Sequence, residues 1–173
     1  MYDATQELER FSTNAWQGRA EGLWYTIVIG LGSQAGEVQT KFLDVVGSWL
    51  RIAEPIHREY GFSCSRDRFP PPEELAPRLP AWFMDTFVAG TDQEIIESDW
   101  RYSFKSWLWA MEERCWNWWG YERDGDALVV QLQVDGWPCP TEELVYLTRV
   151  AGAEIVIVDD TLVYQLEART DQE

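Results

Sequence analysis

Hydrophobic positions along the chain follow two patterns, and each pattern predicts a different kind of element. Residues 23–29 are β-favouring without interruption and end in a glycine, so they predict a strand that is apolar on both faces, which suits the centre of a sheet. The next hydrophobic residues recur at alternating spacings of four and three: Val38, Phe42, Val45, Trp49, Ile52 and Ile56. This spacing places them on one face of a long amphipathic helix.

The C-terminal half predicts two β-hairpins with a helix between them. Each hairpin has two β-favouring segments that flank a pair of turn residues, Asp124-Gly125 in the first and Asp159-Asp160 in the second. The paired segments are residues 115–123 with 127–135, and residues 155–158 with 162–166. Thr141 is the expected N-cap of the helix between the hairpins.

The remaining segments complete an α+β fold. Residues 5–20 and 100–113 predict two more helices, and the proline-rich residues 61–80 predict a surface excursion. Residues 168–173 are expected to fray. We expect one domain over residues 1–173: a mixed, mainly antiparallel sheet with a C-terminal β-β-α-β-β unit, packed by amphipathic helices.

Composition adds a strong negative charge to this picture. The formal net charge is −16 on 173 residues, and the carboxylates are spread along the chain rather than gathered in a tail. Such a surface attracts basic partners and repels nucleic acid phosphates, so direct nucleic acid binding is not expected. Solubility alone accounts for the acidity equally well. The charge leaves open the alternative that the protein mimics nucleic acid and so binds a basic, nucleic-acid-binding protein.

The cysteines and the hydrophobic segments bear on location. Cys64, Cys115 and Cys139 are odd in number and contain no CxxC pair, which predicts reduced thiols and neither a disulfide framework nor a zinc site. No segment approaches the ~20 apolar residues of a membrane span, and residues 1–7 lack the layout of a signal peptide. We therefore expect a cytoplasmic protein without membrane contact.

No catalytic motif stands out, so no enzyme activity, metal or cofactor is predicted. The GxGxxxG run at residues 30–36 departs from the dinucleotide-binding spacing and predicts a tight strand-to-helix turn. His57 is the only histidine, and we expect it to be exposed or to interact with the C-terminal dipole of its helix. Carboxylate pairs beside tryptophans leave a carbohydrate-active enzyme as an alternative.

Tryptophan is the second unusual feature of the composition. Six of the eleven tryptophans fall within residues 100–119. On a strand, Trp116 and Trp118 share one face, while Asn117 and Trp119 share the other. Most of these rings are expected in the core. An exposed ring flanked by carboxylates is typical of an interface that receives Arg or Lys from a partner.

In size, acidity and tryptophan content the chain resembles the bacterial immunity proteins of interbacterial toxin systems. The strand and long helix from Trp24 to Tyr60, about a third of the chain, are similar in organisation to one tryptophan-rich α+β immunity family. The resemblance implies an inhibitor that occludes the cleft of a basic toxin, such as a nuclease. The alternatives are a phage-type anti-defence nucleic-acid mimic, a tryptophan-rich carbohydrate-active enzyme and a self-associating subunit.

The resemblance also implies where such a partner binds. Acidic side chains near the predicted hairpins then stand in for phosphates, and a nearby tryptophan anchors the complex. The residues expected to bind the partner are Glu112, Glu113, Trp118, Trp119, Glu122, Asp124 and Asp126.

Overall fold

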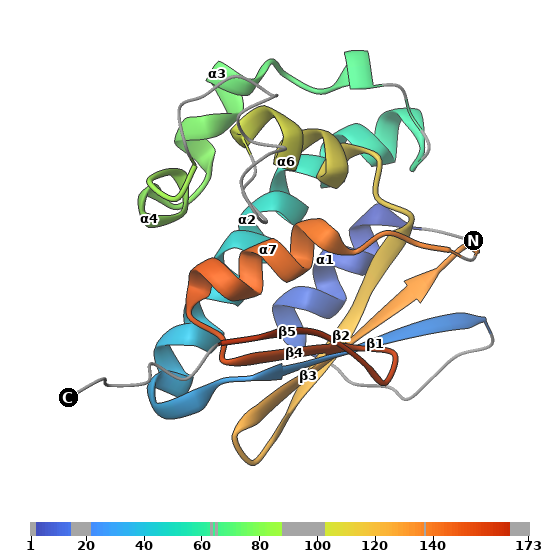
Figure 1. Cartoon of the computed structure of the whole chain (residues 1–173). Coiled ribbons are helices and arrows are strands. Elements are labelled where there is room, and N and C mark those ends of the chain that lie inside the picture. Colours follow the sequence, from blue (N-terminus) through green and yellow to red (C-terminus); the bar gives the residue numbers. More distant parts are fainter. Residues whose placement is uncertain are drawn as a thin grey trace.

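Helices cover one face of a five-stranded antiparallel sheet in the computed structural model of the chain (Figure 1). The structure describes residues 3–14, 22–62, 64, 66–87, 103–136 and 138–166. The strand order is β2-β3-β1-β4-β5. The strands are β1 (Leu23–Gly30), β2 (Trp116–Asp124), β3 (Ala127–Val134), β4 (Ile155–Val158) and β5 (Thr161–Gln165). The predicted α+β class is confirmed.

Strand β1 lies at the centre of the sheet, as its uninterrupted β-favouring sequence predicts. It pairs with β3 along its whole length and with β4 over its last residues, so that Ile27 lies between Val130 and Val158. Tyr25, Ile27 and Ile29 alternate towards the helices and are buried. Both predicted hairpins form, and Asp159 and Asp160 adopt the positive φ angles of 46° and 64° that a tight hairpin turn requires.

Three helices form the layer that packs on the sheet: α1 (Ala4–Thr13), α2 (Ala35–Tyr60) and α7 (Glu142–Ala151). In α2 the predicted apolar face is buried except for the half-buried Ile56, and Pro55 lies within the helix with its ring exposed. Helix α1 ends at Thr13 and is capped by Asn14, which has a left-handed φ of 43°. The rest of the predicted N-terminal helix, residues 15–20, lies outside the described residues, as does the predicted tail at residues 168–173.

A third layer covers the far end of α2 (Figure 1). It contains α3 (Pro72–Leu75), α4 (Ala81–Met84) and α6 (Phe104–Glu112), with the 3₁₀ turns η2 (Arg66–Arg68) and η3 (Ala76–Arg78). Phe69, Leu75 and Leu79 are buried, and Phe69 stacks on Trp49 with ring centroids 5.6 Å apart. The expectation of a surface excursion over residues 61–80 is therefore wrong for these three side chains, which belong to the core.

The glycine-rich segment after β1 makes a tight turn, as predicted. The 3₁₀ turn η1 (Gly32–Gln34) leads directly into α2, and Gly32 has a φ of +62°. The positive φ favours glycine at this position, and a Cβ there would also displace the exposed side chain of Glu154. An antiparallel neighbour on each side of β1 is not the parallel βαβ unit of a dinucleotide site.

A disulfide joins Cys115 to Cys139, whose Cα atoms are 5.7 Å apart. The expectation of reduced thiols is therefore wrong for this pair, whereas Cys64 is a free thiol. The two residues are 24 positions apart in the sequence. Pairing of β2 with β3 returns the chain to its starting end, where Trp116 lies opposite Val134, and so brings the two cysteines together.

None of the helices in the described ranges combines the length and the apolar character that crossing a membrane requires.

Candidate functional site

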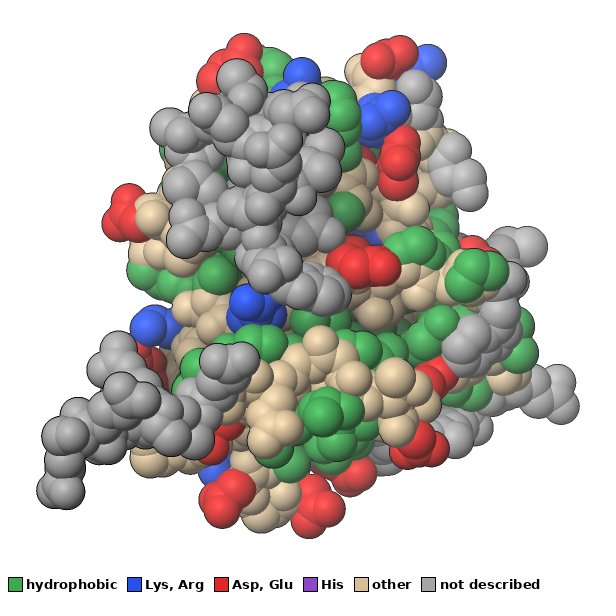
Figure 2. Space-filling model, in the orientation of Figure 1, with side chains coloured by type: hydrophobic (Ala, Val, Ile, Leu, Met, Phe, Trp, Pro, Cys, Tyr) green, Lys and Arg blue, Asp and Glu red, His purple; other side chains and the backbone are tan. Residues whose placement is uncertain are grey.

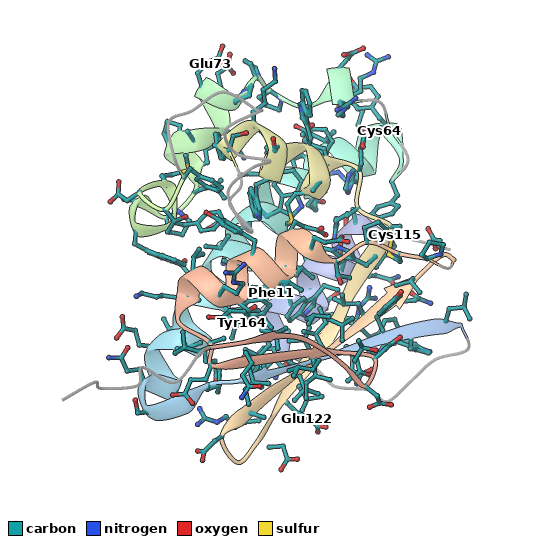
Figure 3. The ribbon with its side chains drawn as sticks, in the orientation of Figure 1. Phe11, Cys64, Glu73, Cys115, Glu122 and Tyr164 are labelled. Atoms are coloured by element: carbon teal, nitrogen blue, oxygen red, sulfur yellow. A yellow bond between two sulfur atoms is a disulfide. The ribbon has the colours of Figure 1, made fainter. Side chains whose placement is uncertain are left out.

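The residues predicted to bind a partner lie at the two ends of β2 rather than on one surface. Glu112 and Glu113 precede this strand, whereas Glu122 and Asp124 lie at its far end. The strand has nine residues, which span about 30 Å. In Figure 3, Glu122 lies near the lower end of the molecule and Cys115 well above it. Strand β2 therefore separates the predicted residues into two groups, one at each of its ends.

The β2–β3 hairpin carries the first group, which we call the acidic tip: Glu122, Asp124 and Asp126. All three side chains are exposed. The exposed Arg123 lies between Glu122 and Asp124 and donates hydrogen bonds to Gly125 O at 2.9 Å and to Gln39 Oε1 at 3.2 Å. Acidic side chains accordingly line the lower edge of the molecule in Figure 2.

The two predicted tryptophan anchors have different surroundings. Trp118 is 0% exposed and packs between Phe11 and Phe42, so its predicted role as a surface anchor is wrong. Trp119 is half-buried and lies at the bulge in β2, between Trp118 and Gly120. Its ring packs edge-on against Trp24, and the guanidinium of Arg10 lies 4.5 Å from its centroid. The chain thus supplies from α1 the cation that we expected from a partner.

A buried ion pair connects α1 with the start of β2. Two nitrogens of Arg114 donate to the two carboxylate oxygens of Glu7, each at 2.7 Å, and both side chains are almost fully buried. Glu7 also accepts a hydrogen bond from the backbone N–H of Trp118 at 2.6 Å. The Arg114 guanidinium lies 4.6 Å from the centroid of Trp116. Its charge is therefore satisfied inside the protein.

Three cavities adjoin one another around the disulfide. The first, which we call the acidic cavity, has a volume of about 300 Å³ and is lined by Phe62, Cys64, Glu112, Glu113, Arg114, Cys115 and Asp135. The second, the middle cavity, is about 240 Å³ and shares Glu113, Arg114 and Cys115 with the first. The third, the apolar cavity, is about 440 Å³ and shares Pro140 and Glu142 with the second. Together they form a recessed surface at this end of the sheet.

Glu112 is the most unusual group in the acidic cavity. It is only 8% exposed, and within the described part of the chain its carboxylate has neither a hydrogen bond nor an ion pair. Burial raises the pKa of Glu112 to about 7, Arg66 opposes this rise, and the neighbouring Glu113 adds to it. Glu113 itself is exposed and pairs with Arg66: its Oε1 lies 3.0 Å from Nε of the arginine.

Glu143, which the sequence did not single out as a site residue, lines the middle cavity. It is 2% exposed and accepts a hydrogen bond of 2.6 Å from the indole N–H of Trp116. Burial raises the pKa of Glu143 to about 7, against the lowering effect of this hydrogen bond. A sequence signal did exist, because Glu143 lies four residues before the buried Leu147 and so shares its helix face.

His57 is buried and not exposed as expected. Its ring packs edge-on against Phe62 and Phe69, with centroids 5.2 and 5.6 Å apart. Burial and the nearby Arg114 lower the pKa of His57 to about 4, while Glu7 acts in the opposite direction. The imidazole is therefore neutral at pH 7. Among the residues described, no cluster of three His, Cys, Asp or Glu side chains is placed to hold a metal ion.

Comparison of the chain with protein families, with characterised proteins and with solved structures finds no match. The recessed surface and the acidic tip are the features of the molecule that bear on its function.

Proposed function

We propose that the protein is an inhibitor that binds a basic protein, in the manner of an immunity protein bound to its toxin. The observation that supports this proposal is the recessed surface around the disulfide. Its cavities are lined by Glu112, Glu113, Asp135, Glu142 and Glu143. Arg114 is the one cation that the described part of the chain contributes to the lining, and it is already paired with Glu7. The recess therefore carries an excess of negative charge that suits a basic partner.

The apolar cavity supplies the second property of a protein-binding surface. It lies between α7 and the sheet, and Tyr25, Val145, Val158 and Val163 contribute apolar walls. Burial of a leucine-sized side chain of a partner there contributes about 1.5–3 kcal/mol. Charge in the acidic and middle cavities then orients the partner, while apolar burial slows its release.

The acidic tip and the net charge affect how fast such a complex forms. A net charge of −16 gives the whole molecule a field that accelerates the approach of a basic protein. The tip side chains are exposed, so salt screens them readily. We therefore assign the tip to long-range attraction and the recess to the bound state.

The disulfide changes the expected environment of the protein. It connects the start of β2 to the loop before α7, and both segments line the recess. Disulfides form and persist in oxidising compartments. The expected cytoplasmic location rested in part on reduced cysteines, so it does not form part of this proposal.

An enzyme is the second candidate, because carboxyl groups with raised pKa values are common in acid–base catalysis. Glu112 and Glu143 both have a pKa of about 7. They line different cavities, however, and Glu143 is held by the indole of Trp116. A pair of catalytic carboxyls must face one substrate bond. Binding makes no such demand, so the arrangement favours a binding protein.

The test is capture of a partner with two variants of equal charge change. The double variant E113K/E142K reverses charge at the recess, whereas E73K/E74K reverses charge on α3, in exposed residues outside the three cavities. We expect the natural chain and E73K/E74K to retain a basic protein at low salt and to release it at high salt. E113K/E142K is expected to retain little of it.

Equal capture by the two variants, or capture of no basic protein from the source cells, contradicts the proposal. An immunity role further requires that the captured protein be toxic and that the natural chain suppress this toxicity. A captured host-defence protein would instead favour the anti-defence alternative.

A further inference from the structure

The acidic cavity contains carboxylates without matching cations. Arg66 is paired with Glu113 and its guanidinium lies 4.8 Å from the ring centroid of Trp109. Arg114 is paired with Glu7. Within the described ranges, the carboxylates of Glu112 and Asp135 have no hydrogen bond or ion pair.

Glu112 distinguishes this cavity from an ordinary acidic surface. Residue Glu112 is only 8% exposed, so its carboxyl group is partly withdrawn from water, and proteins compensate such groups by pairing or hydrogen bonding. Glu112 has neither, and it lines a cavity of about 300 Å³ that has room for another group. A cation that compensates the charge of Glu112 can therefore bind in this cavity.

The size and geometry of the cavity select among cations. Its carboxylates are not gathered closely enough for a metal ion, since the described residues contain no cluster of three metal-binding side chains. A guanidinium is planar and has five N–H donors, so it bridges carboxylates that lie apart, whereas an ammonium is a compact point charge. A volume of about 300 Å³ is at the lower end of ligand pockets and suits one side chain.

We propose that the acidic cavity binds the guanidinium of a single arginine side chain, with Glu112 as the buried counter-charge and Asp135 at the rim. This inference rests on the proposed function, because it names the residue that the partner presents to the recess. The chain already uses the same chemistry at the mouth of the cavity, where Arg66 pairs with Glu113.

A bound guanidinium changes the protonation of Glu112. A nearby cation favours the carboxylate, so binding lowers the pKa of Glu112 from about 7 and releases a proton at neutral pH. Among the described residues, the other charged or titratable groups near Glu112 are Glu113, Asp135, Arg66, Arg114 and Cys64. Burial raises the pKa of the Cys64 thiol, which is therefore neutral at pH 7. Affinity for arginine is expected to rise as the pH increases through 7.

The experiment is a titration of the full chain with N-acetyl-arginine amide, followed by NMR of ¹³C-labelled glutamate carboxyl groups. N-acetyl-citrulline amide is the uncharged control, and N-acetyl-lysine amide separates guanidinium from ammonium. We expect the arginine derivative to bind and to lower the pKa of Glu112, the lysine derivative to bind more weakly, and the citrulline derivative not to bind.

Two variants keep the result specific to the cavity. E112Q preserves shape and removes a costly buried charge, so it is expected to fold and to weaken binding roughly tenfold or more. E73Q removes an equal charge on α3, in an exposed residue outside the three cavities, and is expected to leave affinity unchanged. Absence of arginine binding, equal binding of arginine and lysine, or equal losses in E112Q and E73Q overturns the inference.

This outcome is separable from that of the proposed function. A basic partner captured by a chain that does not bind the arginine derivative overturns the arginine site alone. An arginine derivative that binds when no basic partner is captured overturns the proposed function alone.

Discussion

The two ends of β2 both carry carboxylates, but in opposite surroundings. At the acidic tip, Glu122, Asp124 and Asp126 are exposed. At the disulfide end, Glu112 and Glu143 are 8% and 2% exposed, and burial raises the pKa of each to about 7. Exposed carboxylates cost the folded state little and act at a distance, whereas buried ones cost desolvation and act only on what touches them. We infer that the disulfide end is the specific binding surface.

The largest expected effect is the loss of the buried cation at the disulfide end. Arg114 is enclosed with Glu7, so R114M leaves a buried carboxylate without its partner. We expect a loss of about 3–5 kcal/mol in the free energy of unfolding, measured by urea denaturation. R123M, at the acidic tip, is the control and is expected to change stability by about 0.5 kcal/mol or less. Similar losses in the two variants would remove the difference between the two ends.

Removal of the disulfide is expected to have the next largest effect. The bond closes a loop with a sequence separation of 24 residues. Freeing a loop of this length in C115S/C139S lowers the free energy of unfolding by about 3–4 kcal/mol in the chain-entropy description. The control is C64S, which changes the free thiol at the acidic cavity. If C115S/C139S and C64S have the same free energy of unfolding, the disulfide does not stabilise the structure around the recess.

The pH dependence of stability tests the buried carboxyl of Glu143. Its pKa in the folded state is about 7, above the ordinary value of 4.5 for this carboxyl group, so the folded state binds protons more tightly. Stability from this group is therefore present below about pH 4.5 and is lost as the pH rises through 7, by about 3 kcal/mol in total. E143Q removes this loss and is expected to be more stable than the natural chain at pH 8.

The exposed neighbour provides the control for this measurement. E142Q makes the same chemical change one residue earlier in α7, where the side chain is exposed. Its unfolding free energy is expected to follow the pH profile of the natural chain. An E143Q profile that also follows the natural chain would show that Glu143 is not a buried titrating group.

The smallest effect on stability is expected at the acidic tip, where the effect on kinetics is instead the informative one. E122Q/D124N/D126N is expected to change the unfolding free energy by about 0.5 kcal/mol or less. Because the tip acts at a distance, the variant slows association with the basic partner and flattens its salt dependence. In E113Q/D135N, which alters the recess, the dissociation rate is expected to change instead of the association rate. Surface plasmon resonance measures both rates, and faster dissociation of the tip variant would reverse the two assignments.

Local patterns in the sequence determined the elements and their faces. The spacing of Val38, Phe42 and Val45 predicts the buried face of α2, and the uninterrupted β-favouring run predicts the central strand. The turn residues of both hairpins and the tight turn at Gly32 are likewise visible in the sequence. These features depend on residues a few positions apart, whose backbone preferences act before any distant contact forms.

Only the tertiary structure decided which side chains became buried and which cysteines paired. Glu7 and Arg114 are 107 positions apart, and the cysteines of the disulfide are 24 apart. Trp118 is buried because α1 and α2 cover it, and Glu112 is buried although its neighbour Glu113 is exposed. Burial depends on which distant elements pack against a residue. The sequence therefore determined the acidity of the chain, while packing decided which of its carboxylates became buried in a recess.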